Sequence, residues 1–240
     1  MKGKWIVIAC VVFIGIGLFG TLIHAGSAWA QTKKGVLKIG VCGPLSGAGI
    51  TYGYAALAGL ELKNEEIQKA GGLKVGDTVY SVQPIPYDTK YLPDPSVTAV
   101  KRLVYEDKVK IIFGECGSAA AMAAQPITES NKIIYTINTY TNRTLSPTTL
   151  YTFRTGNTPM EFGPAMLAYY RQQFPQAKKI GYLYREDETG KSMLAMQQKN
   201  APVQGFEVVP LPVEPGTMDL TPLVTKMISL NTDFRRAHVI

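Results

Sequence analysis

The residue with the clearest chemical role in this sequence is Ser118. It follows a predicted strand, Lys110–Phe113, and Gly117, and it stands where a helix is expected to begin. A serine hydroxyl and the backbone N–H groups of a helix N-terminus can hold a carboxylate, because the helix dipole favours negative charge there. The alternative role is a plain helix cap. We favour ligand contact, since a capping serine can serve both purposes.

Histidine is nearly absent, which bears on catalysis. The chain has two, His24 near its start and His238 near its end. Ser-His-Asp and Cys-His catalysis, and most zinc sites, need histidine within the fold. The stretch GPLSGAG (43–49) fits neither the dinucleotide-binding nor the P-loop glycine pattern. We therefore expect no enzyme, no metal and no cofactor. Carboxylate chemistry stays open through three acids, Glu65, Asp187 and Glu188.

Two cysteines remain once Cys10, in the N-terminal segment, is set aside. Cys42 ends the predicted strand Val36–Cys42, and Cys116 lies in the turn after Lys110–Phe113. If these strands are neighbours, the two sulfur atoms come close, and an oxidising compartment would permit a disulfide. Two buried free thiols fit equally well, because cysteine often packs as a small hydrophobic residue.

Strand-like and helix-like stretches alternate along the chain. The predicted helix Tyr54–Lys69 carries Ala55, Ala58, Gly59 and Leu62 on one face and is followed by two glycines. The alternation predicts an α/β fold with parallel sheets and helices on both faces. Further strands are predicted at Thr78–Tyr87, Ile133–Ile137, Leu150–Arg154, Lys179–Tyr184 and Phe206–Pro212. Further helices are predicted to begin at Asp94, to run from Ser118 to about Gln125, to span Glu161–Phe174, to run from the loop Arg185–Gly190 to about Asn200, and to span Leu220–Leu230.

The alternation restarts after Arg154, which predicts two lobes. We expect an N-terminal lobe over residues 31–154 and a second lobe over residues 155–233. Residues 234–240 are too polar for a buried strand and are expected to form an atypical tail. In parallel sheets, ligands sit at the carboxyl ends of the strands. The loop within Lys38–Gly53 is therefore expected to form one wall of a small-molecule cleft.

The first 30 residues have the composition of a secretory signal. Lys2 and Lys4 precede a long apolar run, and Ala28-Trp29-Ala30 offers small residues at a cleavage site. We expect export to the periplasm with residues 1–30 removed, the alternative being an uncleaved membrane anchor. Without these two lysines the net charge falls from +7 to +5. The remaining basic residues are scattered, so we expect no nucleic-acid partner.

In their order and spacing, several stretches resemble the leucine/isoleucine/valine-binding protein family, the type I periplasmic binding proteins of ABC importers. The resemblance implies two Rossmann-like lobes joined by three crossovers, with the ligand held between them. It also implies that the second lobe is incomplete and that the product is truncated or frame-shifted. The stretches that carry it are KIGVCGPLSGAGITYG (38–53), EEIQKAGGL (65–73), DKVKIIFGECGS (107–118), TNRTLSP (141–147), YTFRTGNTPMEFGPAM (151–166) and LVTKMISLN (223–231).

The same resemblance assigns roles in the cleft. It implies that Ser118 binds the α-carboxylate of the ligand, and that Thr141 and the backbone of Thr139 bind its polar ends. Local turn chemistry is the alternative for both threonines. Tyr52 would line the side-chain pocket, or simply pack at the helix start. Thr189 stands where the family often has a pocket tyrosine.

These observations predict an exported, monomeric solute-binding protein that delivers its ligand to an ABC permease. The ligand class is an amino acid, with an amide or a small carboxylate as further options. The alternative function is a ligand-binding sensor domain of a membrane receptor, because the same fold serves that purpose.

Overall fold

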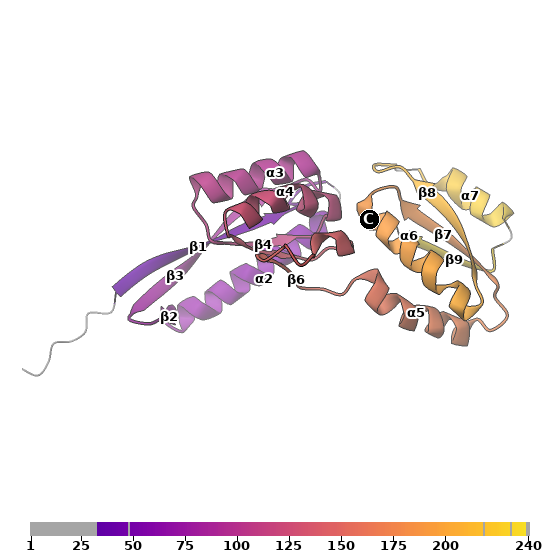
Figure 1. Cartoon of the computed structure of the whole chain (residues 1–240), viewed down its shortest axis with the longest axis horizontal. Coiled ribbons are helices and arrows are strands. Elements are labelled where there is room, and N and C mark those ends of the chain that lie inside the picture. The colour runs from indigo at the N-terminus through magenta and orange to yellow at the C-terminus, as the bar shows by residue number, and fades with distance from the viewer. Residues whose placement is uncertain (1–32, 48, 218, 231, 239–240) are drawn as a thin grey trace, which may run out of the picture.

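The chain forms two α/β lobes in the computed structural model, which describes residues 33–47, 49–217, 219–230 and 232–238 (Figure 1). The predicted signal peptide lies outside the described residues. None of the helices in these ranges is long and apolar enough to cross a membrane. The strands are β1 (Lys33–Gly43), β2 (Leu73–Val75), β3 (Thr78–Asp88), β4 (Ile111–Glu115), β5 (Ile134–Ile137), β6 (Thr152–Arg154), β7 (Lys179–Arg185), β8 (Glu207–Val213) and β9 (Phe234–His238). The helices are α2 (Ile50–Lys69), α3 (Pro93–Lys101), α4 (Ser118–Ser130), α5 (Pro159–Gln173), α6 (Glu188–Asn200) and α7 (Thr221–Ser229), with short helical turns at Arg102–Glu106, Asn142–Thr144 and Pro202–Gln204.

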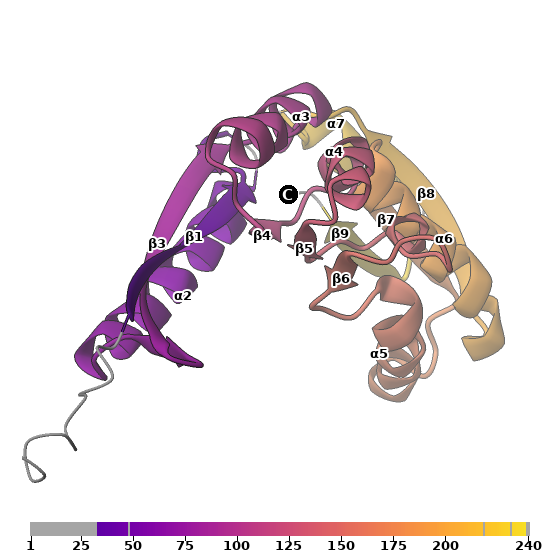
Figure 2. The same cartoon turned by 60° about the vertical axis from the view of Figure 1, so that its left-hand side comes forward.

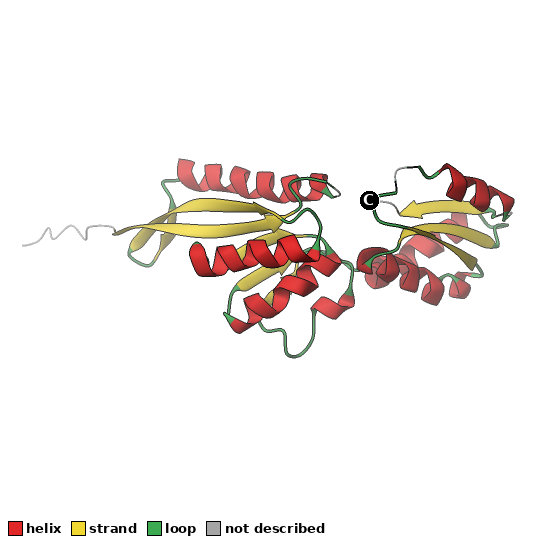
Figure 3. Cartoon of the chain, turned by 90° about the horizontal axis from the view of Figure 1, so that it is seen from above, coloured by secondary structure: helices red, strands yellow, loops and turns green. Residues whose placement is uncertain are grey.

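The first lobe is built on a six-stranded sheet in the order β2-β3-β1-β4-β5-β6. Every neighbouring pair is parallel except the β2–β3 hairpin. Figure 3 shows the strands of this lobe between helices on either side. The α/β class is therefore confirmed, and β1 and β4 are parallel neighbours.

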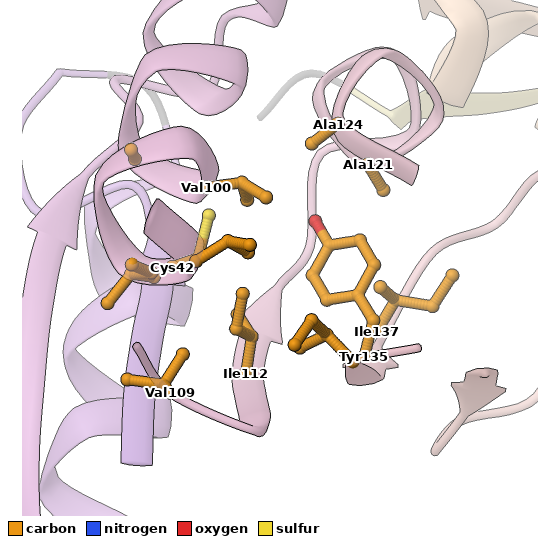
Figure 4. Packing of buried hydrophobic residues seen from close by; sticks show 12 residues of the cluster. Cys42, Val100, Val109, Ile112, Ala121, Ala124, Tyr135 and Ile137 are labelled. Atoms are coloured by element: carbon orange, nitrogen blue, oxygen red, sulfur yellow. The ribbon is translucent and has the colours of Figure 1, made fainter. Parts of the chain in front are cut away.

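One face of the first sheet carries the main core. Residues of α3 and α4 pack there against β1, β4 and β5, and Figure 4 shows Val100 and Ala124 above Cys42, Ile112 and Tyr135. These strand residues are fully buried. Helix α2 lies on the opposite face. Its Ala56 packs against Gly114 of β4, because a Cβ atom added to Gly114 would lie 3.1 Å from the Cβ atom of Ala56.

Helix α2 does not bury the face that its sequence pattern suggested. Leu62 is 63% exposed, and Ala55, Ala58 and Gly59 are exposed as well. The helix covers only part of its side of the sheet, and the residues that turn inward begin with Gly53. Alanine, glycine and leucine positions at helical spacing identify a helix, but they do not decide which side is covered.

The second lobe has a three-stranded parallel sheet in the order β8-β7-β9. Helices α5 and α6 cover one face around Leu167 and Met196, and α7 covers the other around Met227. The expectation of a non-strand tail is wrong, because Phe234–His238 forms β9 beside β7. This strand lies at the sheet edge, where polar residues are tolerated.

Both lobes use one glycine to bring a helix against the preceding strand. A Cβ atom added to Gly53 in α2 would lie 2.6 Å from the carbonyl carbon of Pro44, and one added to Gly190 in α6 would lie 2.8 Å from that of Arg185. In each case the carbonyl oxygen is closer still. Only a residue without a side chain permits this approach of backbone to backbone.

Candidate functional site

The candidate site is the cleft between the lobes, at the carboxyl ends of the first-lobe strands. Because β1, β4 and β5 are parallel neighbours, the segments that follow them share one edge of the sheet. Figures 1 and 2 show this edge facing α6 and β7 of the second lobe. The loop that was expected to form one wall of a cleft therefore lies on the same edge as the turns at 115–118 and 138–141.

Two cavities occupy the cleft. The inner cavity has a volume of about 40 Å³, enough for a few water molecules. The outer cavity, of about 770 Å³, lies beside it and includes Arg185, Lys90 and residues 213–217 in its walls. Tyr91 lines both cavities. The inner cavity is lined by Tyr52, Tyr91, Cys116, Asn138, Tyr140 and Thr189.

Ser118 lies beneath the inner cavity and not in its wall. It is the first residue of α4, while Gly117 occupies the capping position. The side chain is fully buried, and its Oγ accepts a hydrogen bond from the backbone N–H of Tyr140 at 3.3 Å. Plain helix capping is therefore not its role. Ser118 joins the two loops that carry Cys116 and Tyr140.

The two predicted threonines of the next loop make local and interlobe bonds. Thr139 is fully buried and its Oγ1 lies 3.3 Å from that of Thr144, which is turn chemistry. Thr141 caps the short Asn142–Thr144 helix by accepting the N–H of Arg143 at 3.3 Å. Its hydroxyl also donates to Glu188 Oε1 at 2.8 Å. Thr141 therefore lies at a contact between the lobes.

Tyr52 and Thr189 do line the inner cavity, from opposite lobes. Tyr52 is 44% exposed at the start of α2, so it is not packed in a core. Thr189, in the first turn of α6, is buried, and its Oγ1 shares a 3.1 Å hydrogen bond with the hydroxyl of Tyr91. At this position, where the resembled family often has a tyrosine, the threonine is smaller and offers a hydroxyl as a hydrogen-bonding group in place of an aromatic ring.

Four contacts between described residues hold the lobes together across the cleft. Tyr91 meets Thr189, and the guanidinium carbon of Arg185 lies 4.6 Å from the centre of the Tyr91 ring. Glu188 accepts hydrogen bonds from Thr141 and, at 3.1 Å, from Nη1 of Arg143. Arg185 is itself paired with Asp187. The two charged groups of the second lobe in these contacts, Arg185 and Glu188, therefore both already have bonding partners.

Sequence reasoning missed Tyr91 and Arg185. Lys90 and Tyr91 adopt left-handed backbone conformations, with φ of 52° and 63°. Such φ values are uncommon for residues other than glycine and concentrate at functional sites. The sequence TKYLPDP gives no sign of this conformation. Arg185 is the last residue of β7. Its position at the carboxyl end of a predicted strand was the only feature of the sequence that could have marked it as a residue of the cleft.

The cysteines and acids of the cleft do not form a reactive or metal-binding centre. Both Cys42 and Cys116 are free thiols, so no disulfide joins them; Cys42 is buried as expected, whereas Cys116 is only partly buried. Burial, followed by the charge of Glu115, raises the pKa of Cys116 to about 12. A thiol with such a pKa is a poor nucleophile at neutral pH. Within the described ranges, no group of three or more His, Cys, Asp or Glu is placed to hold a metal.

Two α/β lobes with a polar and aromatic cleft between them are the architecture of a ligand-binding protein. The sequence pattern of the periplasmic binding protein family matches residues 36–236, and the chain belongs to this family. Its members are transport components without catalytic activity, which confirms the expectation that the chain is not an enzyme.

Curated relatives support the same assignment. A Leu/Ile/Val-binding protein homolog of Brucella abortus is 29% identical over 233 residues, which cover 92% of this chain and 54% of the relative. The Leu/Ile/Val-binding protein of Citrobacter freundii is 25% identical over 236 residues, covering 98% and 59%. The chain thus spans just over half the length of these relatives.

Solved structures share the fold. A solute-binding protein of an ABC transporter from Rhodopseudomonas palustris, in complex with benzoate, superimposes with a TM-score of 0.73 at 23% identity, covering 85% of this chain and 56% of that one. A leucine-binding protein from Thermotoga maritima gives a TM-score of 0.73 at 22% identity, covering 84% and 55%. The predicted type I periplasmic binding protein fold is therefore confirmed.

Proposed function

We propose that this chain binds an amino acid or a related small polar molecule between its lobes as part of the solute-binding protein of an ABC importer. The observation that carries the proposal is the interlobe cleft, which lies at the carboxyl ends of parallel strands and is lined from both lobes. We place the lobes at residues 31–154 and 155–233, the second extended by β9 (Phe234–His238). The proposed location is the periplasm, and the proposed partner is a membrane permease.

An amino acid is the first ligand class, and an amide or another small carboxylate is the second. Leu/Ile/Val-binding relatives favour the amino acid. The benzoate and 4-hydroxybenzoate complexes among the structural neighbours favour a carboxylate with a ring. Three tyrosines line the inner cavity and would pack against either an aliphatic side chain or a ring.

Binding would replace contacts that now cross the cleft. The hydroxyls of Thr141 and Thr189 bond to Glu188 and Tyr91. Separation of the lobes by a hinge motion would release these hydroxyls for a ligand, which would then hold the lobes together. Ser118 and the backbone of Thr139 would support the loop that meets the carboxylate, and Tyr52 would shape the pocket.

Isothermal titration calorimetry of the chain tests this proposal. The panel contains leucine, isoleucine, valine, threonine, benzoate and 4-hydroxybenzoate. We expect saturable binding of at least one compound, weakened about fivefold in Thr189→Val, because one hydrogen bond contributes roughly 1 kcal/mol. Thr225→Val, on the exposed surface of α7, is the matched control and should bind like the wild type. Unchanged affinity in Thr189→Val would remove that hydroxyl from the site.

Localisation needs a separate experiment. We expect the chain expressed in a Gram-negative host to appear in the osmotic-shock fraction, shortened by about 30 residues. A variant that begins after Ala30 should stay inside the cell. Retention of the full-length chain in the membrane fraction would instead favour an uncleaved anchor.

A further inference from the structure

A buried carboxylate lies directly beneath the cleft, at the end of β4. The pairing of β4 with β5 shifts register between Phe113 and Glu115, and Gly114 has a φ of +106°. Such a bulge adds one residue to the strand, so the usual alternation of faces is broken after Gly114. Glu115 therefore turns onto the same face as Ile112, toward α3. Its side chain is 0% exposed.

The carboxylate of Glu115 binds its own following loop. Oε1 accepts the backbone N–H of Cys116 at 3.0 Å and that of Gly117 at 2.8 Å. The backbone carbonyl of Glu115 accepts the N–H of Asn138 at 2.8 Å. Cys116 and Asn138 both line the inner cavity. One residue thus fixes two of the loops that form the wall of the cleft.

The other carboxylate oxygen faces neutral groups. Oε2 accepts the hydroxyl of Ser96, from α3, at 3.3 Å, and the thiol of Cys42, from β1, at 3.8 Å. Thr89, which follows β3, also faces the carboxylate. In Figure 4 the thiol of Cys42 and the hydroxyl of Tyr135 point toward the same end of the core. No salt bridge between described residues includes Glu115.

Glu115 is the member of this cluster that titrates near neutral pH. Burial raises its pKa to about 7, although its hydrogen bonds to Gly117, Ser96 and Cys116, and the nearby hydroxyl of Thr89, act in the opposite direction. The other titratable groups that face it are Cys42, Cys116 and Tyr135. Burial raises the pKa of each of them, to about 12 for Cys116 and well above the ordinary value for the other two.

We propose that Glu115 is a positioning residue of the cleft, whose ionised carboxylate holds the Cys116–Gly117 loop and whose protonation loosens it. The physical basis is that hydrogen bonds from N–H groups to a carboxylate are about twice as strong as those to a neutral acceptor. Through this loop the start of α4, and with it Ser118 beneath the inner cavity, follows the charge of Glu115. The consequence for ligand binding rests on the function proposed above, but the loop's response to pH does not.

Nuclear magnetic resonance of the ligand-free chain tests the proposal. We expect the amide proton shifts of Cys116 and Gly117 to titrate with a midpoint near pH 7, because both protons point at Glu115 Oε1. The amide of Tyr182, buried in the second lobe, serves as the control and should not follow this midpoint. Shifts that stay constant between pH 5 and 9 would overturn the proposal.

Two variants separate positioning from structural support. Glu115→Gln keeps an oxygen acceptor for the two N–H groups, so the chain should fold and the titration of both amides should vanish. Ser96→Ala removes a bond that lowers the pKa of Glu115, so the midpoint should move to higher pH. A titration that persists in Glu115→Gln, or a midpoint unmoved in Ser96→Ala, would contradict the assignment. Because no ligand is needed, failure here is distinct from failure of the proposed function.

Discussion

A matched pair of substitutions in α2 tests how the first lobe is assembled. Gly53 and Gly59 lie in the same helix and differ in surroundings. A Cβ atom at Gly53 would lie 2.6 Å from the carbonyl carbon and 3.0 Å from the nitrogen of Pro44, all backbone that cannot rotate away. A Cβ atom at Gly59 would meet nothing within 4 Å. The same change, glycine to alanine, should therefore have opposite effects.

The expected magnitudes follow from these distances. Carbon atoms pack at roughly 3.5–4.0 Å, so Gly53→Ala must shift α2 or the Pro44 loop by on the order of 1 Å. Overpacking of this kind costs roughly 1–3 kcal/mol, and we expect about 3 kcal/mol because only backbone can give way. Gly59→Ala should stabilise the helix by about 1 kcal/mol, through helix propensity alone.

Urea denaturation followed by circular dichroism measures both effects. With a slope of about 2 kcal/mol per molar urea, the midpoint should fall by about 1.5 M in Gly53→Ala and rise by about 0.5 M in Gly59→Ala. The shift of α2 would also move Tyr52, so Gly53→Ala should weaken ligand binding. A Gly53→Ala protein as stable as the wild type would refute the close contact between α2 and Pro44.

Three further outcomes are expected. Because folding raises the pKa of Glu115 from 4.5 to about 7, the unfolded chain loses this proton at a lower pH than the folded chain does. The free energy of unfolding should therefore fall by roughly 3 kcal/mol as pH rises from 4.5 to 7, and Glu115→Gln should abolish that slope in urea titrations at several pH values. Glu188→Ala should speed deuterium exchange at the backbone amides of residues 141–144, since it removes the carboxylate that accepts the hydrogen bond of the Thr141 hydroxyl. The control substitution Glu186→Ala, at an exposed position, should leave this exchange unchanged. Arg171→Lys should destabilise the second lobe by about 2 kcal/mol in thermal denaturation, because the planar guanidinium reaches the carbonyls of Pro175, Ala177 and Gln204 together; equal stability would contradict this.

The regular elements of the fold were accessible from sequence because their signals are local. β1 and β7 each contain a short apolar run. Helix α5 is preceded by the capping residue Thr158, which forms a capping box with Glu161 close to the predicted start. The family resemblance then placed these elements in two lobes. β9 was missed because its side chains are largely polar, and we expected a strand only from an apolar run. An edge strand can be held by its backbone hydrogen bonds to one neighbour, which the side-chain pattern does not show.

The cleft was less accessible because its contacts are set by tertiary structure. Thr141 was singled out as a candidate from the sequence, yet its partner, Glu188, is 47 residues away. Tyr91 reaches the cleft through a left-handed backbone. Glu115 turns inward through a bulge at Gly114, and a simple strand pattern would place it on the other face. None of these three features follows from residue type and spacing.

Hydrogen–deuterium exchange with and without ligand tests the central claim most directly. The ligand is the compound from the calorimetric panel that binds with the highest affinity. If the ligand sits between the lobes, saturation should slow exchange at residues 116–118 and 138–141 of the first lobe and, together with them, at residues 187–190 of the second. Protection confined to one lobe, or to residues outside the cleft, would contradict the account.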